Sequence, residues 1–376
     1  MKNTQIKTQD KGCVLLAAGG TGGHLFPAES LAHALIERGY SVELATDARA
    51  RKFADDFPAK NIHVIQSATV SGKNPIALFT TGLALAKGYL QSRRIIKAAN
   101  PKAVIGFGGY PTLPPLICAN RMGIPTLLHE QNAVLGRANK MLAKKAGGVA
   151  VGFNQVAKVP NASVVETGNP IRPMVEAVLD AKYKTRKKTD TLRLVVFGGS
   201  QGARIFSEIL PAALELLSKN ERATLSILQQ ARPEDEAALK AEYKALGVKA
   251  EIASFFKNMP QEISDAHFVI ARAGASSITE LAVLGRPSLL VPLPGSLDGD
   301  QENNAIAMKE AGGAFVVRQS DLSAQRLADI LSNAIEKPKE LEAMGKAAKK
   351  TGIVNAADKL ADCVECVIGG GDIAKL

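Results

Sequence analysis

Two short apolar runs, each followed by a glycine-rich turn and an amphipathic stretch, lie about half the chain apart. The first run is residues 14–17, and the turn after it is residues 19–23, the first glycine loop. The second run is residues 194–197, and the turn after it is residues 198–202, the second glycine loop. An apolar run predicts a buried strand, and helical spacing after the turn predicts a helix. The pattern therefore predicts two α/β domains.

The two glycine loops differ in the residue types around them. Both are expected to present backbone N–H groups at the start of a helix, where anions bind well. The first loop ends at His24, whose imidazole can move a proton near neutral pH. The second loop is neutral and suits the cradling of a phosphate. This difference suggests acceptor chemistry in the first domain and a phosphorylated donor in the second.

Neither loop matches the dinucleotide fingerprint G-x-G-x-x-G. Leu25 stands where the first loop would need glycine or alanine, and Gln201 interrupts the second. Asp47, after an expected strand at residues 41–46, nevertheless lies where a ribose-binding acid would lie, so an NAD site stays open as an alternative. No G-K-[ST] follows either loop, which excludes a Walker nucleotide site.

Polar residues follow further predicted strands in each half of the chain. The strand at residues 125–128 leads into His129, Glu130, Gln131 and Asn132, and ligands bind past the carboxyl ends of parallel strands. His129 and Asn132 are therefore site candidates. In the second half, a strand at residues 268–270 leads into a helix start of small and hydroxylated residues that ends at Glu280. Such a helix start can hold phosphates and Glu280 can hold ribose hydroxyls, while a cluster of helix-capping residues is the alternative.

Composition favours an anionic partner. The 376 residues suffice for two domains, and the net charge of +11 and pI of about 9.4 fit a phosphorylated substrate, an anionic membrane surface or nucleic acid. Nucleic acid is excluded from the interpretation because no aromatic recognition run and no Trp are present. Residues 1–12 lack the apolar core of a signal peptide, which predicts a cytoplasmic protein. The four cysteines are expected to be reduced thiols, and no ligand spacing indicates a metal or cofactor.

Residues 75–90 form an apolar stretch with cations at its ends. Ile76, Leu78, Phe79 and Leu83 share it with Thr and Gly, and the flanking cations are Lys73, Lys87, Arg93, Arg94 and Lys97. The stretch is too short to cross a bilayer but could lie on anionic lipid. A core helix with a solvated basic end is the alternative. The function inferred below favours the membrane.

Six motifs in this order resemble the MurG family, the N-acetylglucosaminyltransferases that convert lipid I to lipid II in peptidoglycan synthesis. They lie at residues 19–24, 129–132, 168–172, 198–203, 272–280 and 300–304. The resemblance implies a GT-B fold, in which two Rossmann-like α/β domains face each other across a cleft. It implies an acceptor and membrane-facing domain at residues 1–172 and a UDP-GlcNAc-binding domain at residues 173–352. A helix in residues 353–376 would return to the first domain.

The resemblance also assigns roles to residues of this sequence. Thr21, Gly22, Gly23 and Asn132 would face the donor sugar and diphosphate, and Arg172 and Ser200 would contact the UDP phosphate region. Gln201 is a further substrate-binding candidate. Ala275, Ser276, Ser277, Ile278, Thr279 and Glu280 would form the nucleotide-binding turn, with Glu280 on the ribose. Phe256 would lie at the uracil and Gln301 at the sugar hydroxyls. Phe256, Ser276, Ser277 and Asp300 depart from the family's commoner residues, which weakens the assignments there.

The implied reaction is attack by the MurNAc 4-hydroxyl of lipid I on the anomeric carbon of UDP-GlcNAc, with inversion and loss of UDP. His24 is the expected base, with His129 and Glu130 as the other candidates. No metal is expected, and the enzyme would act as a peripheral protein at the cytoplasmic face of the membrane. A UDP-GlcNAc 2-epimerase of the same fold and a non-catalytic nucleotide-sugar-binding regulator are the alternative functions.

Overall fold

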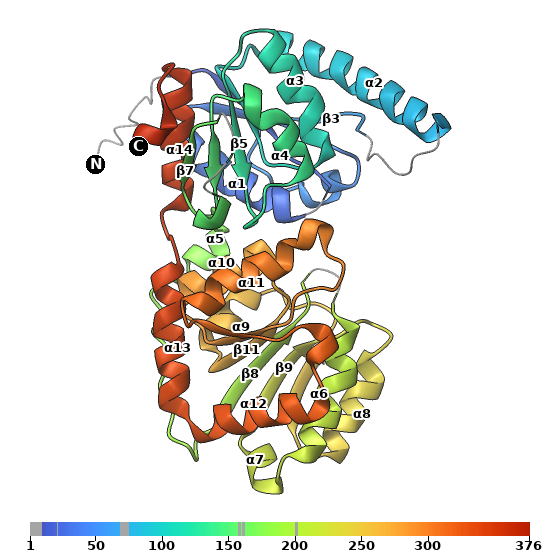
Figure 1. Ribbon diagram of the computed structural model, residues 1–376, viewed down its shortest axis with the longest axis vertical. Helices are drawn as coiled ribbons and strands as arrows, with labels where there is room; N and C mark the ends of the chain where they lie inside the picture. The colour runs from blue at the N-terminus through green and yellow to red at the C-terminus, as the bar shows by residue number, and fades with distance from the viewer. Residues whose placement is uncertain (1–9, 21, 68–74, 157–158, 160–161, 200–201) are drawn as a thin grey trace, which may run out of the picture. The chain divides into compact units, whose positions relative to one another are not determined.

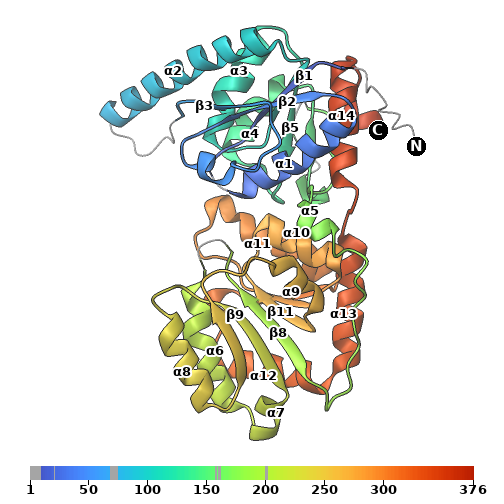
Figure 2. The same ribbon diagram turned by 180° about the vertical axis from the view of Figure 1, so that it is seen from behind.

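The chain folds into two compact units, each with its own parallel sheet (Figures 1 and 2). The computed structural model of the protein describes residues 10–20, 22–67, 75–156, 159, 162–199 and 202–376. Unit 1 consists of the residues up to Arg172 together with Ile353–Leu376, and unit 2 is Pro173–Gly352. The C-terminal segment therefore belongs to the same unit as the N-terminal half of the chain.

Unit 1 is built on a seven-stranded parallel sheet with the strand order β3-β2-β1-β4-β5-β6-β7. The strands are β1 (Cys13–Ala17), β2 (Ser41–Thr46), β3 (Asn61–Val64), β4 (Ala103–Gly106), β5 (Thr126–Glu130), β6 (Val149–Val151) and β7 (Val164–Glu166). Val14 of β1 lies opposite Val42 of β2 and Ala103 of β4. Helices cover both faces of such a sheet, which explains why its central strands are continuous apolar runs.

The residues of β1 alternate between two hydrophobic cores, because successive side chains of a strand point to opposite faces. Val14 and Leu16 pack with α1 (Gly22–Glu37) and α14 (Ala356–Ile368). Leu15 and Ala17 pack on the other face with α2 (Pro75–Ala99), α3 (Leu113–Arg121) and α4 (Arg137–Leu142). Unit 1 is therefore a three-layer α/β unit whose strand ends are left for loops.

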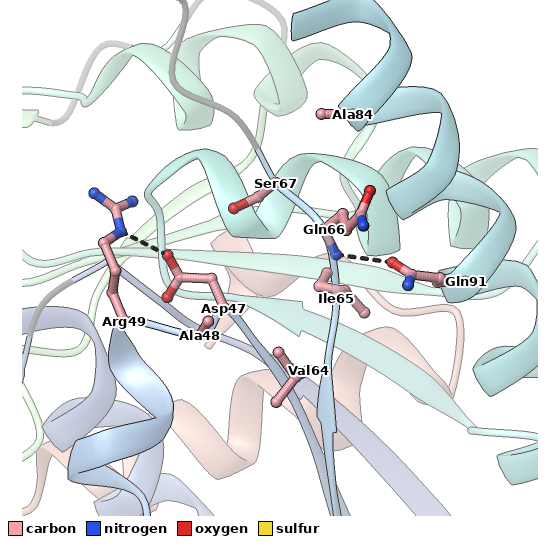
Figure 3. A pocket seen from close by; sticks show the side chains of 9 residues that line it. All are labelled: Asp47, Ala48, Arg49, Val64, Ile65, Gln66, Ser67, Ala84 and Gln91. Atoms are coloured by element: carbon pink, nitrogen blue, oxygen red, sulfur yellow. Dashed lines mark hydrogen bonds and ion pairs between the residues drawn. The ribbon is translucent and has the colours of Figure 1, made fainter. Parts of the chain in front are cut away.

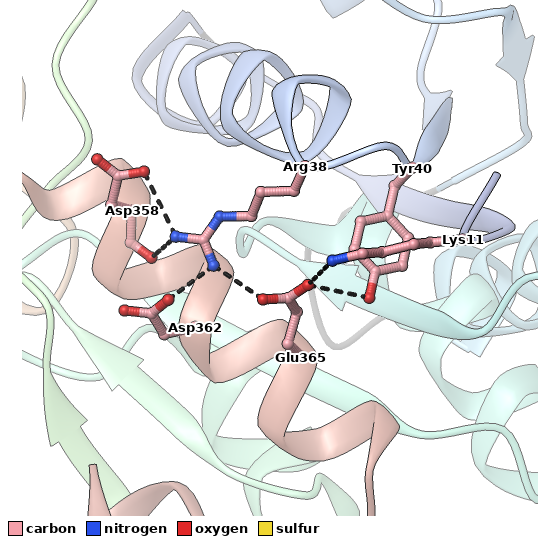
Figure 4. A network of polar contacts seen from close by, with 6 residues as sticks. All are labelled: Lys11, Arg38, Tyr40, Asp358, Asp362 and Glu365. Atoms are coloured by element: carbon pink, nitrogen blue, oxygen red, sulfur yellow. Dashed lines mark hydrogen bonds and ion pairs between the residues drawn. The ribbon is translucent and has the colours of Figure 1, made fainter. Parts of the chain in front are cut away.

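Helix α14 is attached to unit 1 by both apolar and charged contacts (Figure 4). Leu360 and Val364 are fully buried in the core beside α1. Arg38 donates to Asp362 at 2.6 Å and to Glu365 at 3.0 Å, and Lys11 pairs with Glu365 at 2.7 Å. These ion pairs are partly exposed, so the buried apolar side chains supply most of the stabilisation.

Unit 2 repeats the plan with a six-stranded parallel sheet in the order β10-β9-β8-β11-β12-β13. The strands are β8 (Leu192–Phe197), β9 (Leu225–Gln230), β10 (Lys249–Ala253), β11 (Phe268–Ala271), β12 (Ser288–Leu290) and β13 (Ala314–Val316). The helices are α5 (Pro173–Glu176), α6 (Arg204–Leu216), α7 (Lys219–Ala223), α8 (Glu236–Ala245), α9 (Met259–Asp265), α10 (Ala275–Leu284), α11 (Asp300–Glu310), α12 (Ala324–Glu336) and α13 (Pro338–Thr351). One large core joins the sheet to α6, α8 and α12.

The basic segment before β8 is fastened to unit 2. Arg186 is buried and donates to the carbonyl oxygens of Ala334 and Ile335 at 2.7 and 2.6 Å, at the end of α12. Arg286 is also buried and donates to the carbonyl oxygen of Ala181 at 2.9 Å. Carbonyl groups at a helix end lack intrahelical partners and attract cations. These two buried arginines thus hold the segment before β8 on unit 2.

A helix with the length and apolar content that a bilayer crossing demands is not found among the described residues.

Candidate active site

Both glycine loops lie where the order of strands along the sheet reverses. In unit 1 the chain runs from β1 outward to β3 and then returns to β4 on the other side of β1. In unit 2 it runs from β8 outward to β10 and then returns to β11. Ligands of open parallel sheets bind in the crevice at this point, outside the carboxyl ends of the strands. The fold therefore places both loops at ligand-binding positions of their own sheets.

Asp47 holds the first glycine loop in place. Its Oδ1 atom accepts hydrogen bonds from the backbone N–H groups of Gly20 and Ala50, each at 3.0 Å, and its Oδ2 atom accepts from Nε of Arg49 at 3.0 Å. Burial alone would raise the pKa of this carboxyl, but these hydrogen bonds lower it below its usual value. Asp47 thus holds the first glycine loop through these hydrogen bonds. Its position therefore no longer argues for an NAD ribose at this residue. Thr21 lies outside the described residues.

His24 is half-buried in the first turn of α1, beside the turn at Gly108 and Gly109. Its Nδ1 atom lies 3.1 Å from the carbonyl oxygen of Gly19, which can only accept a hydrogen bond. Nδ1 therefore carries the hydrogen, and the lone pair of the neutral ring is on Nε2. The ring lies against Gly108 and Gly109, where a Cβ on Gly108 would be 3.4 Å from Nε2. Gly22 and Gly23 precede His24 in the same turn.

His129 and Glu130 are the last two residues of β5, so the prediction that they follow the strand is wrong. The strand continues because they pair with Ala150 and Val151 of β6. His129 is fully buried: its Nε2 donates to the carbonyl oxygen of Gly168 at 3.1 Å, and its Nδ1 accepts from Nε2 of Gln131 at 3.0 Å. Burial lowers the pKa of His129 to about 4. Its ring is neutral and both nitrogens are engaged.

The Glu130 carboxylate is a buried hub for the loop after β5. It accepts hydrogen bonds from the backbone N–H groups of Asn132 at 3.1 Å and Gly136 at 2.8 Å, and from Nδ2 of Asn139 at 2.9 Å. Burial raises the pKa of Glu130, and these hydrogen bonds oppose that rise. The group that orients Asn132 is therefore Glu130. Asn139 completes this cluster but was not among the residues predicted from the sequence. No local motif around Asn139 indicates that it contacts Glu130.

The segment of residues 168–172 is tied to the same edge of unit 1. Asn169 donates to the carbonyl oxygen of Gln131 at 3.0 Å, and the Ser30 hydroxyl of α1 donates to the carbonyl oxygen of Ile171 at 2.8 Å. The guanidinium of Arg172 lies 5.0 Å from the ring centre of Phe26. Three motifs that are far apart in the sequence, at residues 19–24, 129–132 and 168–172, thus meet in one unit.

In unit 2 the second glycine loop closes tightly on the start of α6. A Cβ on Gly198 would lie 2.3 Å from the backbone nitrogen of Ala203, so only glycine allows this approach. The backbone N–H of Gly198 faces Oε1 of Gln230 at 3.4 Å, at the end of the adjacent strand β9. Ser200 and Gln201 lie outside the described residues.

Helix α10 begins at the neighbouring strand end with no side-chain cap on Gly274. Ala275, Ser276, Ser277 and Thr279 are half-buried in its first turns, whereas Ile278 and Glu280 are buried. The first N–H groups of a helix have no intrahelical partner, so this uncapped end suits an anion. Arg272 just before it is turned inward, donating to the carbonyl oxygens of Val291 and Pro292, each at 3.1 Å.

Gln301 joins this turn to the loop after β12. Its Oε1 atom accepts from the backbone N–H groups of Ala273 at 3.2 Å and Leu293 at 3.0 Å. Among the described residues its Nε2 amide has no hydrogen-bond partner. Asn304 donates to the carbonyl oxygen of Ala273 at 3.2 Å and supports the same turn. Phe256, after β10, is half-buried, while the adjacent Phe255 is 71% exposed.

The exposed face of α2 carries large apolar side chains. Phe79 is 73% exposed, Leu83 50% and Leu90 57%, and Lys87, Arg93, Arg94 and Lys97 are exposed on the same helix. Lys73 and the side chains of Ile76 and Leu78 lie outside the described part of the structure. In the described half of the stretch these apolar side chains therefore face outward, whereas Ile96 further along α2 is buried in the core.

Within the described ranges, no group of three or more His, Cys, Asp or Glu side chains is arranged to hold a metal ion.

Two family models match the chain, one to each unit. The glycosyltransferase family 28 N-terminal domain matches residues 14–151, and the family 28 C-terminal domain matches residues 193–360. Among solved structures, MurG from Acinetobacter baumannii matches with a TM-score of 0.77 and 28% identity over 94% of this chain and 99% of that one. A UDP-GlcNAc 2-epimerase from Neisseria meningitidis has a TM-score of 0.65 at 14% identity over 94% and 99%. That second likeness shows the fold alone.

A curated relative matches nearly the whole sequence at a higher identity than the MurG structure does. The UDP-N-acetylglucosamine–N-acetylmuramyl-(pentapeptide) pyrophosphoryl-undecaprenol N-acetylglucosamine transferase of Brucella suis is 54% identical over 362 residues, 96% of both chains. The likeness therefore spans both α/β units of the chain. The chain belongs to glycosyltransferase family 28 and, within it, to the MurG family.

Proposed function

We propose that this chain transfers N-acetylglucosamine from UDP-GlcNAc to the MurNAc 4-hydroxyl of lipid I, the undecaprenyl diphosphate-linked MurNAc pentapeptide, and so forms lipid II. The proposal rests on 54% identity to a transferase named for this donor and acceptor. The observation that supports catalysis is the position of His24 at the reversal point of the sheet in unit 1, with its lone pair on Nε2.

In this proposal His24 is the general base. The acceptor oxygen forms a bond to the anomeric carbon, the bond from that carbon to the UDP oxygen breaks, and Nε2 takes the hydroxyl proton. His129 and Glu130 are less suited, since both are buried and already hydrogen-bonded to their own neighbours. We assign them to positioning the loop that carries Asn132.

The donor is proposed to bind unit 2. The uncapped N-terminus of α10, with Ala275, Ser276 and Ser277, and the second glycine loop with Ser200 and Gln201 would hold the diphosphate. Ile278 and Thr279 would complete the turn. Glu280 would accept hydrogen bonds from the ribose, Phe256 would lie against the uracil, and Nε2 of Gln301 would donate to a sugar hydroxyl. Its Oε1 atom is held by backbone N–H groups, so the amide is oriented in advance.

Unit 1 is proposed to supply the remaining contacts. Thr21, Gly22, Gly23 and Asn132 would face the sugar and diphosphate of the donor, and Arg172 would contact the UDP phosphates. Charge that develops on the departing diphosphate would be stabilised by N–H groups of the loops, by the start of α10 and by Arg172. These groups can act without a bound metal.

The membrane surface is proposed as a partner of α2. A lipid-linked acceptor is confined to a bilayer, and an enzyme that lies on that bilayer meets it more often. Phe79 and Leu83 offer exposed apolar area, and Lys87, Arg93 and Arg94 offer positive charge for anionic lipid. We infer a peripheral position on the cytoplasmic face of the membrane.

Release of UDP from UDP-GlcNAc, measured with and without a short-chain lipid I analogue, tests the function. We expect release only when the acceptor is present, together with a product one N-acetylglucosamine heavier. Formation of the 2-epimer of the sugar without acceptor, either free or still linked to UDP, would indicate the epimerase. Tight UDP-GlcNAc binding with no release under either condition would indicate the regulator.

A further inference from the structure

We propose that a pocket in unit 1 binds the peptide of the acceptor through its carboxylate. The proposal rests on the proposed function, because only that function supplies an acceptor with a peptide. The pocket lies between the carboxyl ends of β2 and β3 and helix α2, next to the first glycine loop (Figure 3). Its volume is about 620 Å³, within the range of small-molecule and peptide sites.

The wall of the pocket formed by residues 64–67 is held rigidly against α2. A Cβ on Gly88 of α2 would lie 2.1 Å from the carbonyl oxygen of Gln66, so glycine is required for this approach. The backbone N–H of Gln66 donates to Oε1 of Gln91 at 2.8 Å, as Figure 3 shows. A wall that these two contacts already fix to α2 does not have to be ordered by its ligand, which favours binding.

The lining suits a peptide better than a polyprenyl chain. Val64, which is 49% exposed, and Ala84 supply apolar area for small side chains. Gln66 and Ser67 supply amide and hydroxyl groups that can bond to a peptide backbone. A polyprenyl chain would leave these polar groups without partners, which costs free energy.

Arg49 is the group that selects a carboxylate. Its Nε donates to Asp47, while its two terminal nitrogens point away from Asp47 and have no hydrogen-bond partner among the described residues (Figure 3). A guanidinium with two such nitrogens can bind a carboxylate through parallel hydrogen bonds. The side chain is 66% exposed, so an incoming peptide can reach it.

Asp47 links this pocket to the proposed reaction site. One oxygen of Asp47 holds Gly20 of the first glycine loop and the other holds Arg49. The other wall of the pocket is α2, which carries the exposed apolar residues Phe79 and Leu83. An acceptor whose sugar lies at His24 and whose lipid lies toward α2 would thus have its peptide in the pocket between the first glycine loop and α2.

The test compares three short-chain acceptors: one with the pentapeptide, one with every peptide carboxyl group amidated, and one with the peptide removed. Arg49→Gln should raise KM for the first acceptor about 10- to 100-fold, the effect of losing a charge-assisted hydrogen bond. Amidation of the acceptor's carboxyl groups should raise the unmodified enzyme's KM for that acceptor by a similar factor. In Arg49→Gln the same amidation should change KM little. KM for the peptide-free acceptor and for UDP-GlcNAc should be the same in both enzymes.

Two further variants separate the pocket from the glycine loop and from overall charge. Ala84→Phe fills the pocket from α2 without touching Asp47 and should also raise KM for the peptide acceptor alone. Arg51→Gln removes a cation paired with Asp55, outside the pocket, and should leave all three KM values unchanged. Equal KM for the three acceptors in the unmodified enzyme would overturn the pocket proposal. No turnover of any acceptor would contradict the proposed function instead.

Discussion

The two glycine loops share one scaffold and differ in the side chains gathered around them. Each loop follows a central strand at the reversal point of its sheet. Around the first loop, His24, Asp47, His129 and Glu130 come together from two strand ends and a helix. Around the second, Gly198 faces the neutral amide of Gln230 and Gly202 lies against the stem of Arg232, and neither side chain is a base near neutral pH. In the proposed function the same fold would thus provide a site for proton transfer and a site for holding a nucleotide, because function depends on the residues at the strand ends.

The titratable groups of unit 1 also differ from one another in burial and in hydrogen bonding. His129 and Glu130 are buried and occupied by hydrogen bonds from their own loop, whereas His24 is only half-buried and has its basic nitrogen beside a glycine turn. Burial lowers the pKa of His129 and raises the pKa of Glu130, so in both groups burial opposes the charged form. A cluster of ionisable residues therefore need not share one role.

The largest expected effect comes from removing the base on the unit 1 side. His24→Ala should lower kcat on the order of 10²- to 10⁴-fold and leave UDP-GlcNAc affinity nearly unchanged, because a general base acts in the transition state. Steady-state kinetics and calorimetry would measure the two quantities. His33→Ala, which removes an exposed histidine from the same helix, should keep normal kcat. Turnover retained by the His24 variant would move the role to Glu130 or to a water molecule.

The next effect concerns stability and tests the structural role of His129. Its pKa is about 4 when folded and about 6.5 when unfolded, so between these values only the unfolded state takes up the proton. The free energy of unfolding should therefore fall by about 1.4 kcal/mol per pH unit as pH drops through this window, about 3 kcal/mol in all. His129→Gln should remove this contribution and flatten the pH dependence. Urea unfolding at several pH values would measure it, and equal slopes for both proteins would contradict it.

On the unit 2 side, Glu280→Ala should weaken UDP binding by about 1 to 3 kcal/mol, the usual contribution of a hydrogen bond to a charged group. Calorimetry with UDP would measure the change. Glu340→Ala, which removes an exposed carboxylate paired with Lys337 on α13, is the matched control and should bind UDP normally. Unchanged UDP affinity in the Glu280 variant would remove the ribose from this turn.

The smallest effect is expected on α2. This helix is the proposed membrane surface of unit 1, and the proposal gives unit 2 no such surface. Phe79→Ser combined with Leu83→Ser should weaken binding to anionic vesicles by about 1 to 2 kcal/mol, since both side chains are already partly covered. The part of vesicle binding that survives high salt should be lost, because salt screens only the cations. Turnover of a short-chain acceptor should persist. Equal vesicle binding by the double variant would exclude α2 as the membrane surface.

Local patterns were sufficient for the elements and the family. The apolar run before each glycine loop is a strand, β1 or β8, and the helical spacing after the first loop is α1. Six short motifs in a fixed order indicated the MurG family, and the comparisons confirm this. Such features are readable because strand and helix periods and glycine turns depend on residues close together in the chain.

Roles at the site depended on contacts between residues far apart in the sequence. From the sequence, Asp47 could hold a ribose, and His129 and Glu130 could act as bases. In the structure Asp47 holds Gly20, His129 lies against Gly168, and Glu130 holds Asn139. The pKa and the accessibility of a side chain depend on burial and on such partners, which no local pattern encodes. Local sequence therefore specifies which chemical groups are available, and long-range packing selects which of them can act.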